Sequence, residues 1–155
     1  MTVKIIVGLM IVLCSSVMGN LYSVKFKRKY DFFVCLEDFA LYLKREIAFS
    51  SSAVQAIASS FKTDNDDLRE LLSSFSQSGA CNLPKYITAD DENLLIPFFE
   101  KIGRSDRVNE IEMINTFFDD VRAVKERERI RCQRVGGAST KIGFFIGLIL
   151  FFVLV

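Results

Sequence analysis

The chain of 155 residues contains no histidine, and this absence argues against several kinds of reactive site. Histidine is the usual base beside a serine or cysteine nucleophile and one of the commonest metal ligands. The four cysteines, Cys14, Cys35, Cys81 and Cys132, are widely spaced and form no CxxC pair that could hold zinc. We interpret them as reduced thiols and expect neither a metal site nor a catalytic site.

A glycine-rich phosphate loop is also missing. The segment KIGRSDR at residues 101–107 gathers a glycine, a hydroxyl and charges, but it lacks the GxxxxGK[ST] spacing that turns successive backbone amides toward a phosphate. The carboxylate clusters at residues 90–92 and 119–120 fit helix caps and solvated helix faces better than an acid–base pair. We therefore expect no cofactor and no enzymatic activity.

The chain has no large excess of either charge, and it has no stretch in which polar and apolar residues alternate steadily. Its formal net charge is only +1, whereas a nucleic-acid-binding domain needs a basic excess with interleaved aromatic residues. Sustained alternation is the signal of a half-buried strand. The sequence therefore predicts an all-α protein that does not bind nucleic acid.

Two long apolar runs lie at the ends of the chain, at residues 5–22 and 142–155. As a helix the first run reaches roughly 27 Å, close to the thickness of the hydrocarbon layer of a bilayer. The second is shorter, but the uncharged residues 135–140 can extend it while Lys141 reaches to the interface. We predict transmembrane segments at residues 1–22 and 135–155 that flank a helical domain at residues 23–134.

Basic residues beside both runs predict the orientation. Four follow the first run and five precede the second: Lys25, Lys27, Arg28, Lys29, Lys125, Arg127, Arg129, Arg131 and Arg134. Such clusters stay on the cytoplasmic side, so the domain is expected in the cytoplasm and both termini outside. The alternative is a signal peptide cleaved near Gly19, because Lys4 precedes the run. The product would be an exported protein held by its C-terminal membrane helix.

Apolar residues recur at helical spacing in three segments of the domain, at residues 31–49, 53–61 and 66–77. The predicted buried residues are Phe32, Leu36, Phe39, Leu43, Ile47, Val54, Ile57, Ala58, Phe61, Leu68, Leu71, Leu72 and Phe75. Gly79 is expected to end the third helix.

The next segment contains both prolines of the chain. Pro84 indicates a connection, and Thr88 with Asp91 resembles a capping box. A helix is predicted through residues 96–102. Pro97 argues against an unkinked helix that begins as early as Ala89.

The segment KIGRSDR then reads as a tight joint between two helices. Gly103 suits the left-handed position that closes a helix, Ser105 can cap the next one, and Asp106 favours the positive end of its dipole. A long helix is predicted from about residue 105 to residue 134, with Ile111, Ile114, Phe118 and Val121 along its buried side. Its second half is expected to be exposed, with Glu128 in reach of Arg127 or Arg131.

This order of features resembles the stage III sporulation AB protein family over essentially the whole chain. The shared motifs are KFKRKY at residues 25–30, LKREIAF at 43–49, IGRSDR at 102–107 with Ile111 and Ile114 after it, and a glycine-led C-terminal span. The joint IGRSDR carries most of the specificity of this resemblance.

The resemblance implies a component of the mother-cell membrane complex around the developing spore. Its helical domain is similar to the cytoplasmic domains of inner-membrane platforms in type II secretion and type IV pilus machines. The implied partners are a hexameric secretion-type ATPase, other stage III sporulation membrane proteins and the lipid bilayer. Charged residues on and beside the long helix are expected to be exposed and are candidates for the docking surface, because charges at the rim of an interface set specificity and association rate. They are Arg104, Arg107, Glu110, Asp119 and Asp120.

Overall fold

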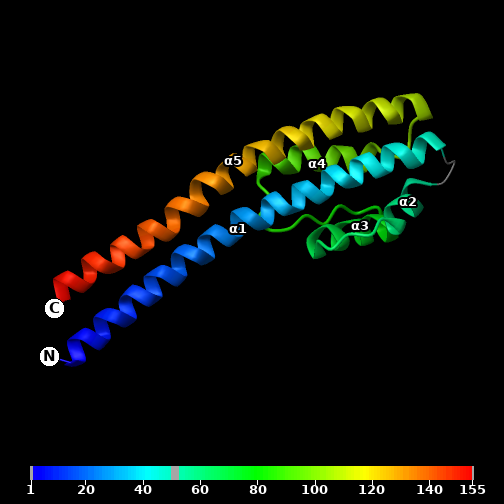
Figure 1. The fold of residues 1–155 in the computed structure, drawn as a ribbon. Helices are drawn as coiled ribbons and strands as arrows, with labels where there is room; N and C mark the ends of the chain where they lie inside the picture. The colour runs from blue at the N-terminus through cyan, green and yellow to red at the C-terminus, as the bar shows by residue number, and fades with distance from the viewer. Residues whose placement is uncertain (1, 50–52, 155) are drawn as a thin grey trace. The chain divides into compact units, whose positions relative to one another are not determined.

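The computed structural model describes the backbone of residues 2–49 and 53–154, with side-chain detail mainly for residues 24–134. These residues form helices and no strand, in agreement with the predicted all-α class. The helices are α1 (Thr2–Phe49), α2 (Val54–Ser60), α3 (Asp66–Ser78), α4 (Ala89–Lys101) and α5 (Arg107–Leu154) (Figure 1).

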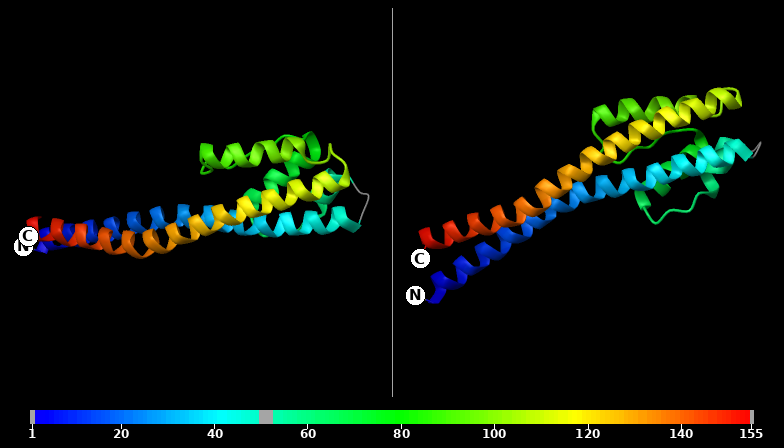
Figure 2. Two further views of the ribbon diagram at one scale, coloured as in Figure 1. Left: turned by 90° about the horizontal axis from the view of Figure 1, so that it is seen from above. Right: turned by 45° about the horizontal axis from the view of Figure 1, so that its top comes forward.

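The chain divides into two compact units, to which α1 and α5 both contribute. The central unit is Asp31–Glu126, and the terminal unit combines Met1–Tyr30 with Arg127–Val155. Within the terminal unit the two helical segments run antiparallel and side by side, with both chain ends at the same end of the pair (Figure 2).

Both predicted membrane segments fall in the terminal unit. Their side chains lie outside the described residues, apart from the exposed Met10, Phe145 and Ile149. In the described part of the chain, none of the helices combines the length and the apolar character that a membrane span needs. The domain boundaries at residues 22 and 134 stay predictions.

The core of the central unit follows the predicted apolar stripes. All four predicted residues of α3 are buried, as are all five of the segment 31–49 within α1. Of the predicted stripe at residues 53–61, Val54, Ile57 and Ala58 are buried and Phe61 is partly buried. The spacing of apolar residues therefore identified most of the core residues that α1, α2 and α3 contribute.

Aromatic rings connect the helices of the central unit. Phe39 of α1 meets Phe61, which follows α2, with ring centroids 5.4 Å apart. Phe75 of α3 lies 5.1 Å from Phe99 of α4. Edge-to-face pairs of this kind stabilise a core beyond the area they bury, by about 0.5–1.5 kcal/mol each.

Helix α3 ends where the sequence predicts. The side chain of Asn65 caps its start by accepting a hydrogen bond from the Leu68 N–H at 3.0 Å, and Gly79 closes it in the left-handed region at φ 69°. Glycine has no Cβ atom, so it adopts this left-handed conformation without steric strain.

Helix α4 begins at Ala89 and continues through Pro97, so the helix starts as early as the sequence argued against. Asp91 anchors the first turn, because its carboxylate accepts hydrogen bonds from the N–H of Thr88 at 3.4 Å and from its hydroxyl at 2.6 Å. Leu95 and Phe98, on either side of the exposed Pro97, are buried in the core. Packing therefore offsets the hydrogen bond that proline cannot donate.

The joint between α4 and α5 is present. Gly103 has φ 84°, as predicted for a helix-closing glycine. Helix α5 begins at Arg107, which puts Asp106 rather than Ser105 at the cap position. The backbone carbonyl of Asp106 accepts the N–H of Glu110 at 2.9 Å, and its side chain accepts a hydrogen bond from Asn109.

The buried side of α5 differs in part from the predicted one. Ile114 and Val121 are buried, whereas Ile111 and Phe118 are only partly buried. Phe117 is buried instead of Phe118, because it packs against α4, where Phe98 stacks on it.

The charged half of α5 also differs from its prediction. The expected pairs of Glu128 with Arg131 and Arg127 are present at 3.3 and 3.8 Å. However, Glu128 itself is fully buried, and its Oε1 lies 3.1 Å from the Nζ of the buried Lys29 on α1. The expectation of an exposed helix is therefore wrong at this position.

Candidate partner-binding groove

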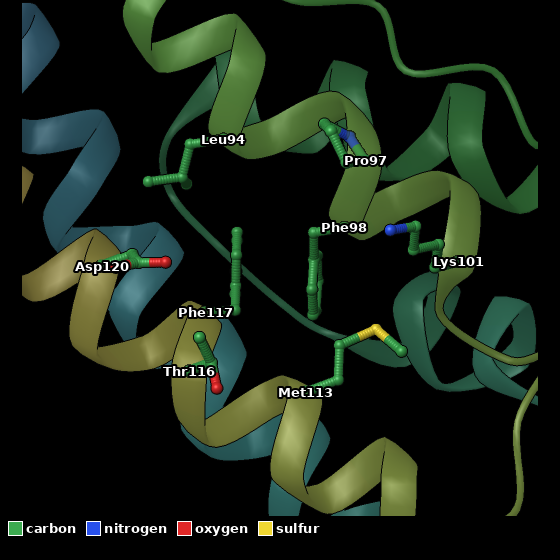
Figure 3. Close-up of a pocket in the computed structure, with 8 residues that line it drawn as sticks. All are labelled: Leu94, Pro97, Phe98, Lys101, Met113, Thr116, Phe117 and Asp120. Atoms are coloured by element: carbon green, nitrogen blue, oxygen red, sulfur yellow. The ribbon is translucent and has the colours of Figure 1, made fainter.

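An open groove runs along the contact between α4 and the first half of α5. It has a volume of about 250 Å³ (Figure 3). The lining residues are Leu94, Pro97, Phe98 and Lys101 from α4, and Met113, Thr116, Phe117 and Asp120 from α5. On each helix these positions recur at spacings of three or four, which places them on one face.

Two stacked rings form the centre of the groove. The rings of Phe98 and Phe117 are nearly parallel, with an interplanar angle of 5° and centroids 3.6 Å apart. Both residues are almost fully buried, so they belong to the core as well as to the groove. The chemistry that this centre offers is apolar contact.

Opposite charges stand at the two ends of the groove. Lys101 lies beside Met113 at one end, and Asp120 lies beside Leu94 at the other (Figure 3). Both charged residues are exposed. An apolar centre with a charged rim is the usual arrangement of a protein–protein contact.

The size of the groove indicates which of two kinds of ligand fits it, a small molecule or the side chains of a partner protein. Pockets that bury a drug-sized molecule or a cofactor enclose about 300–1,000 Å³ and surround most of the ligand. This groove is smaller, and it is open. It suits one or two side chains of a partner protein better than a nucleotide.

A second cavity, of about 240 Å³, lies between α2 and α3. Its polar groups are already bonded within the protein. Ser59 and Ser76 donate to backbone carbonyls, and Arg69 donates to Asp66 at 2.7 Å. We therefore regard the groove between α4 and α5 as the better candidate site.

The five predicted docking residues do not form one surface. Arg104, Arg107, Asp119 and Asp120 are exposed, but the expectation of exposure is wrong for Glu110, which is 8% exposed. Glu110 lies in the first turn of α5, and it is buried although its neighbours Val108 and Asn109 are exposed.

Helix geometry also separates these residues. Arg107 and Asp120 are roughly 20 Å apart along the axis of α5, at about 1.5 Å per residue. Asp119 and Asp120 both lie more than about 100° around the helix from Arg107. Only Asp120 lines the groove.

Sequence reasoning missed the other groove residues. Lys101 lies near the end of one predicted helix, and Met113 and Thr116 lie in the next one. A single sequence does not reveal which two helices pack together. No local pattern marked Thr116 either, because the polar residues Glu112 and Asn115 lie close to it in the sequence.

The described cysteines, Cys35, Cys81 and Cys132, are all partly buried. Burial, together with the nearby carboxylate of Glu100, raises the pKa of the Cys81 thiol from 9.0 to about 11. A thiol in this state is a poor nucleophile. Among the described residues, no group of three or more cysteine and carboxylate side chains is placed to hold a metal ion.

Comparison of the chain with protein-family models, with curated proteins and with solved structures gives no match.

Proposed function

We propose that this protein is a membrane-attached platform without enzymatic activity, and that its central unit docks a cytoplasmic partner in the groove between α4 and α5. The groove is the observation that carries the proposal. Its apolar centre and its two charged ends match an amphipathic partner segment that inserts one or two apolar side chains.

The resemblance to the stage III sporulation AB family supplies the partner. We propose that the segment belongs to a secretion-type ATPase, and that the chain acts in the mother-cell membrane around the forespore. The apolar runs at residues 5–22 and 142–155 support attachment to the bilayer at both ends. Membrane attachment and docking are separate parts of the proposal.

Co-purification of the ATPase with the full-length chain, extracted from sporulating cells in an uncharged detergent, tests the docking part. Two variants alter the groove without removing core residues. In the first, Thr116→Trp fills the groove with a large side chain. In the second, Lys101→Glu with Asp120→Lys exchanges the charges at its two ends. All three side chains are exposed. Each change is expected to reduce the recovered ATPase at least tenfold.

The matched control is Lys62→Glu with Glu70→Lys, which makes the same charge changes on exposed residues away from the groove. It is expected to retain the ATPase. Undiminished recovery with both groove variants would refute the groove as the docking site. Undiminished recovery after deletion of residues 23–134 would refute recruitment by the helical domain altogether.

A further inference from the structure

Charge is divided very unequally between the two units. The terminal unit contains ten basic residues and one acidic residue, a formal net charge of +9. The central unit contains ten basic and eighteen acidic residues, a formal net charge of −8. The net charge of +1 for the whole chain conceals this division.

The positive charge is densest where the terminal unit adjoins the central unit along the sequence. Residues 24–30 and 127–134, which we name the basic collar, hold eight basic residues and one acidic residue. If the neighbouring Asp31 and Glu126 are included, the net charge is still +5. Six of the basic side chains are exposed: Lys27, Arg28, Arg127, Arg129, Arg131 and Arg134.

The only acid of the basic collar is withdrawn from its surface. Glu128 is fully buried, and its carboxylate faces Lys29, which is also buried. This pair joins α1 to α5, so the basic residues of both segments lie around the same level of the helix pair. The exposed charge of the basic collar is therefore entirely positive.

We propose that the basic collar binds the headgroups of anionic phospholipids. Clusters of four to eight Lys and Arg next to a membrane segment are attracted to the anionic cytoplasmic leaflet. The basic collar begins two residues after the first apolar run, which places it at headgroup depth. This proposal rests on the proposed membrane attachment. Nucleic acid is the less favoured ligand, because the central unit would repel it.

Calorimetric titration of the full-length chain in an uncharged detergent tests this proposal, with phosphatidylglycerol, phosphatidylcholine and a short DNA duplex as the titrants. Phosphatidylglycerol is expected to bind, more weakly as salt is raised, and phosphatidylcholine is not. The variant Lys27→Gln, Arg129→Gln, Arg134→Gln is expected to bind phosphatidylglycerol on the order of a hundredfold more weakly, because each basic residue contributes about a factor of five.

The matched control removes the same charge from exposed residues of the central unit, with Lys44→Gln, Lys62→Gln and Arg122→Gln, and is expected to bind as the unchanged chain does. Equal binding of both lipids, equal binding by the two triple variants, or tighter binding of the DNA would overturn the proposal. Membrane attachment is tested separately, by washing cell membranes with high salt and no detergent. Release of the chain into the wash would refute attachment by the two apolar runs, whatever the titration shows.

Discussion

Glu128 shows how the burial of one side chain depends on a residue far away in the sequence. Its neighbours Arg127 and Arg129 are charged, and this local pattern is typical of a solvated helix face. The buried partner, Lys29, comes from the other end of the chain. The second carboxylate oxygen of Glu128 has no hydrogen-bond partner in the described part of the protein. Removing this oxygen from water therefore costs free energy that no hydrogen bond to it offsets.

We predict that Glu128→Ala destabilises the protein by about 3–5 kcal/mol, because it leaves the ammonium group of Lys29 buried without this carboxylate. Denaturant unfolding of the full-length chain in an uncharged detergent measures the loss. The double variant Lys29→Met with Glu128→Leu is expected to lose less than Glu128→Ala alone, since apolar side chains need no counter-charge. The account of the pair would be contradicted if the double variant lost as much stability as Lys29→Met alone and Glu128→Leu alone lose together.

A second prediction concerns Cys81, whose raised pKa should appear in its reactivity. The thiolate is the reactive form, so alkylation of the folded protein by iodoacetamide should remain slow through pH 9 and rise toward about pH 11. In urea the rate should reach half of its plateau near pH 9.0, the ordinary pKa of the thiol, and should level off above that pH. The measurement uses a chain in which the other three cysteines are serine. The same pH profile in both states would show that burial does not act on this thiol.

The sign of the effect on stability follows from the same shift. The folded pKa of Cys81 lies above the unfolded value, so the unfolded chain releases the proton first as the pH rises. This thiol therefore favours the folded state below pH 9 and loses that contribution between pH 9 and about pH 11.

At the scale of helices, the ends of α3 and α4 show which signals are local. Gly79 and Gly103 both have positive φ, and each lies where a helical pattern of apolar residues stops, which is visible in the sequence. The two glycines differ in their surroundings. A Cβ on Gly79 would meet nothing within 4 Å, whereas a Cβ on Gly103 would lie 3.3 Å from a methyl group of Val54 on α2.

This difference predicts unequal costs for the same change. Gly79→Ala should cost about 1–2 kcal/mol, the strain of a left-handed alanine. Gly103→Ala should cost more, because the new methyl group also crowds Val54. Thermal unfolding of the two variants, compared with the unchanged chain, measures both losses. If Gly103→Ala lowered the stability less than Gly79→Ala, the packing of Gly103 against Val54 of α2 would not be as close as described.

The helices and most of the core could be predicted because their signals are local. Apolar spacing identified the buried sides of α1 and α3, and glycine marked two helix ends. The path of α4 through Pro97 and the burial of Phe117 instead of Phe118 could not be predicted, because both depend on how α4 packs against α5. The groove is formed by that packing, which explains why only Asp120 of its eight lining residues was among the predicted docking residues.

At the scale of the whole molecule, two surfaces with different chemistry occur in different units. The central unit is acidic and carries a small apolar groove, whereas the terminal unit is basic around a buried ion pair. An acidic unit favours a partner surface of positive charge, which speeds association and limits wrong contacts. In the proposed arrangement the terminal unit meets the bilayer and the central unit meets the partner.

Site-specific crosslinking tests this claim most directly. A photo-reactive amino acid is placed at Thr116, in the groove, or at Lys62, outside it, in the full-length chain. After irradiation of intact sporulating cells, we predict a crosslink between position 116 and the secretion-type ATPase, and none from position 62. Crosslinks to the ATPase from position 62 but not from position 116, or crosslinks from position 116 only to exported proteins, would contradict the account.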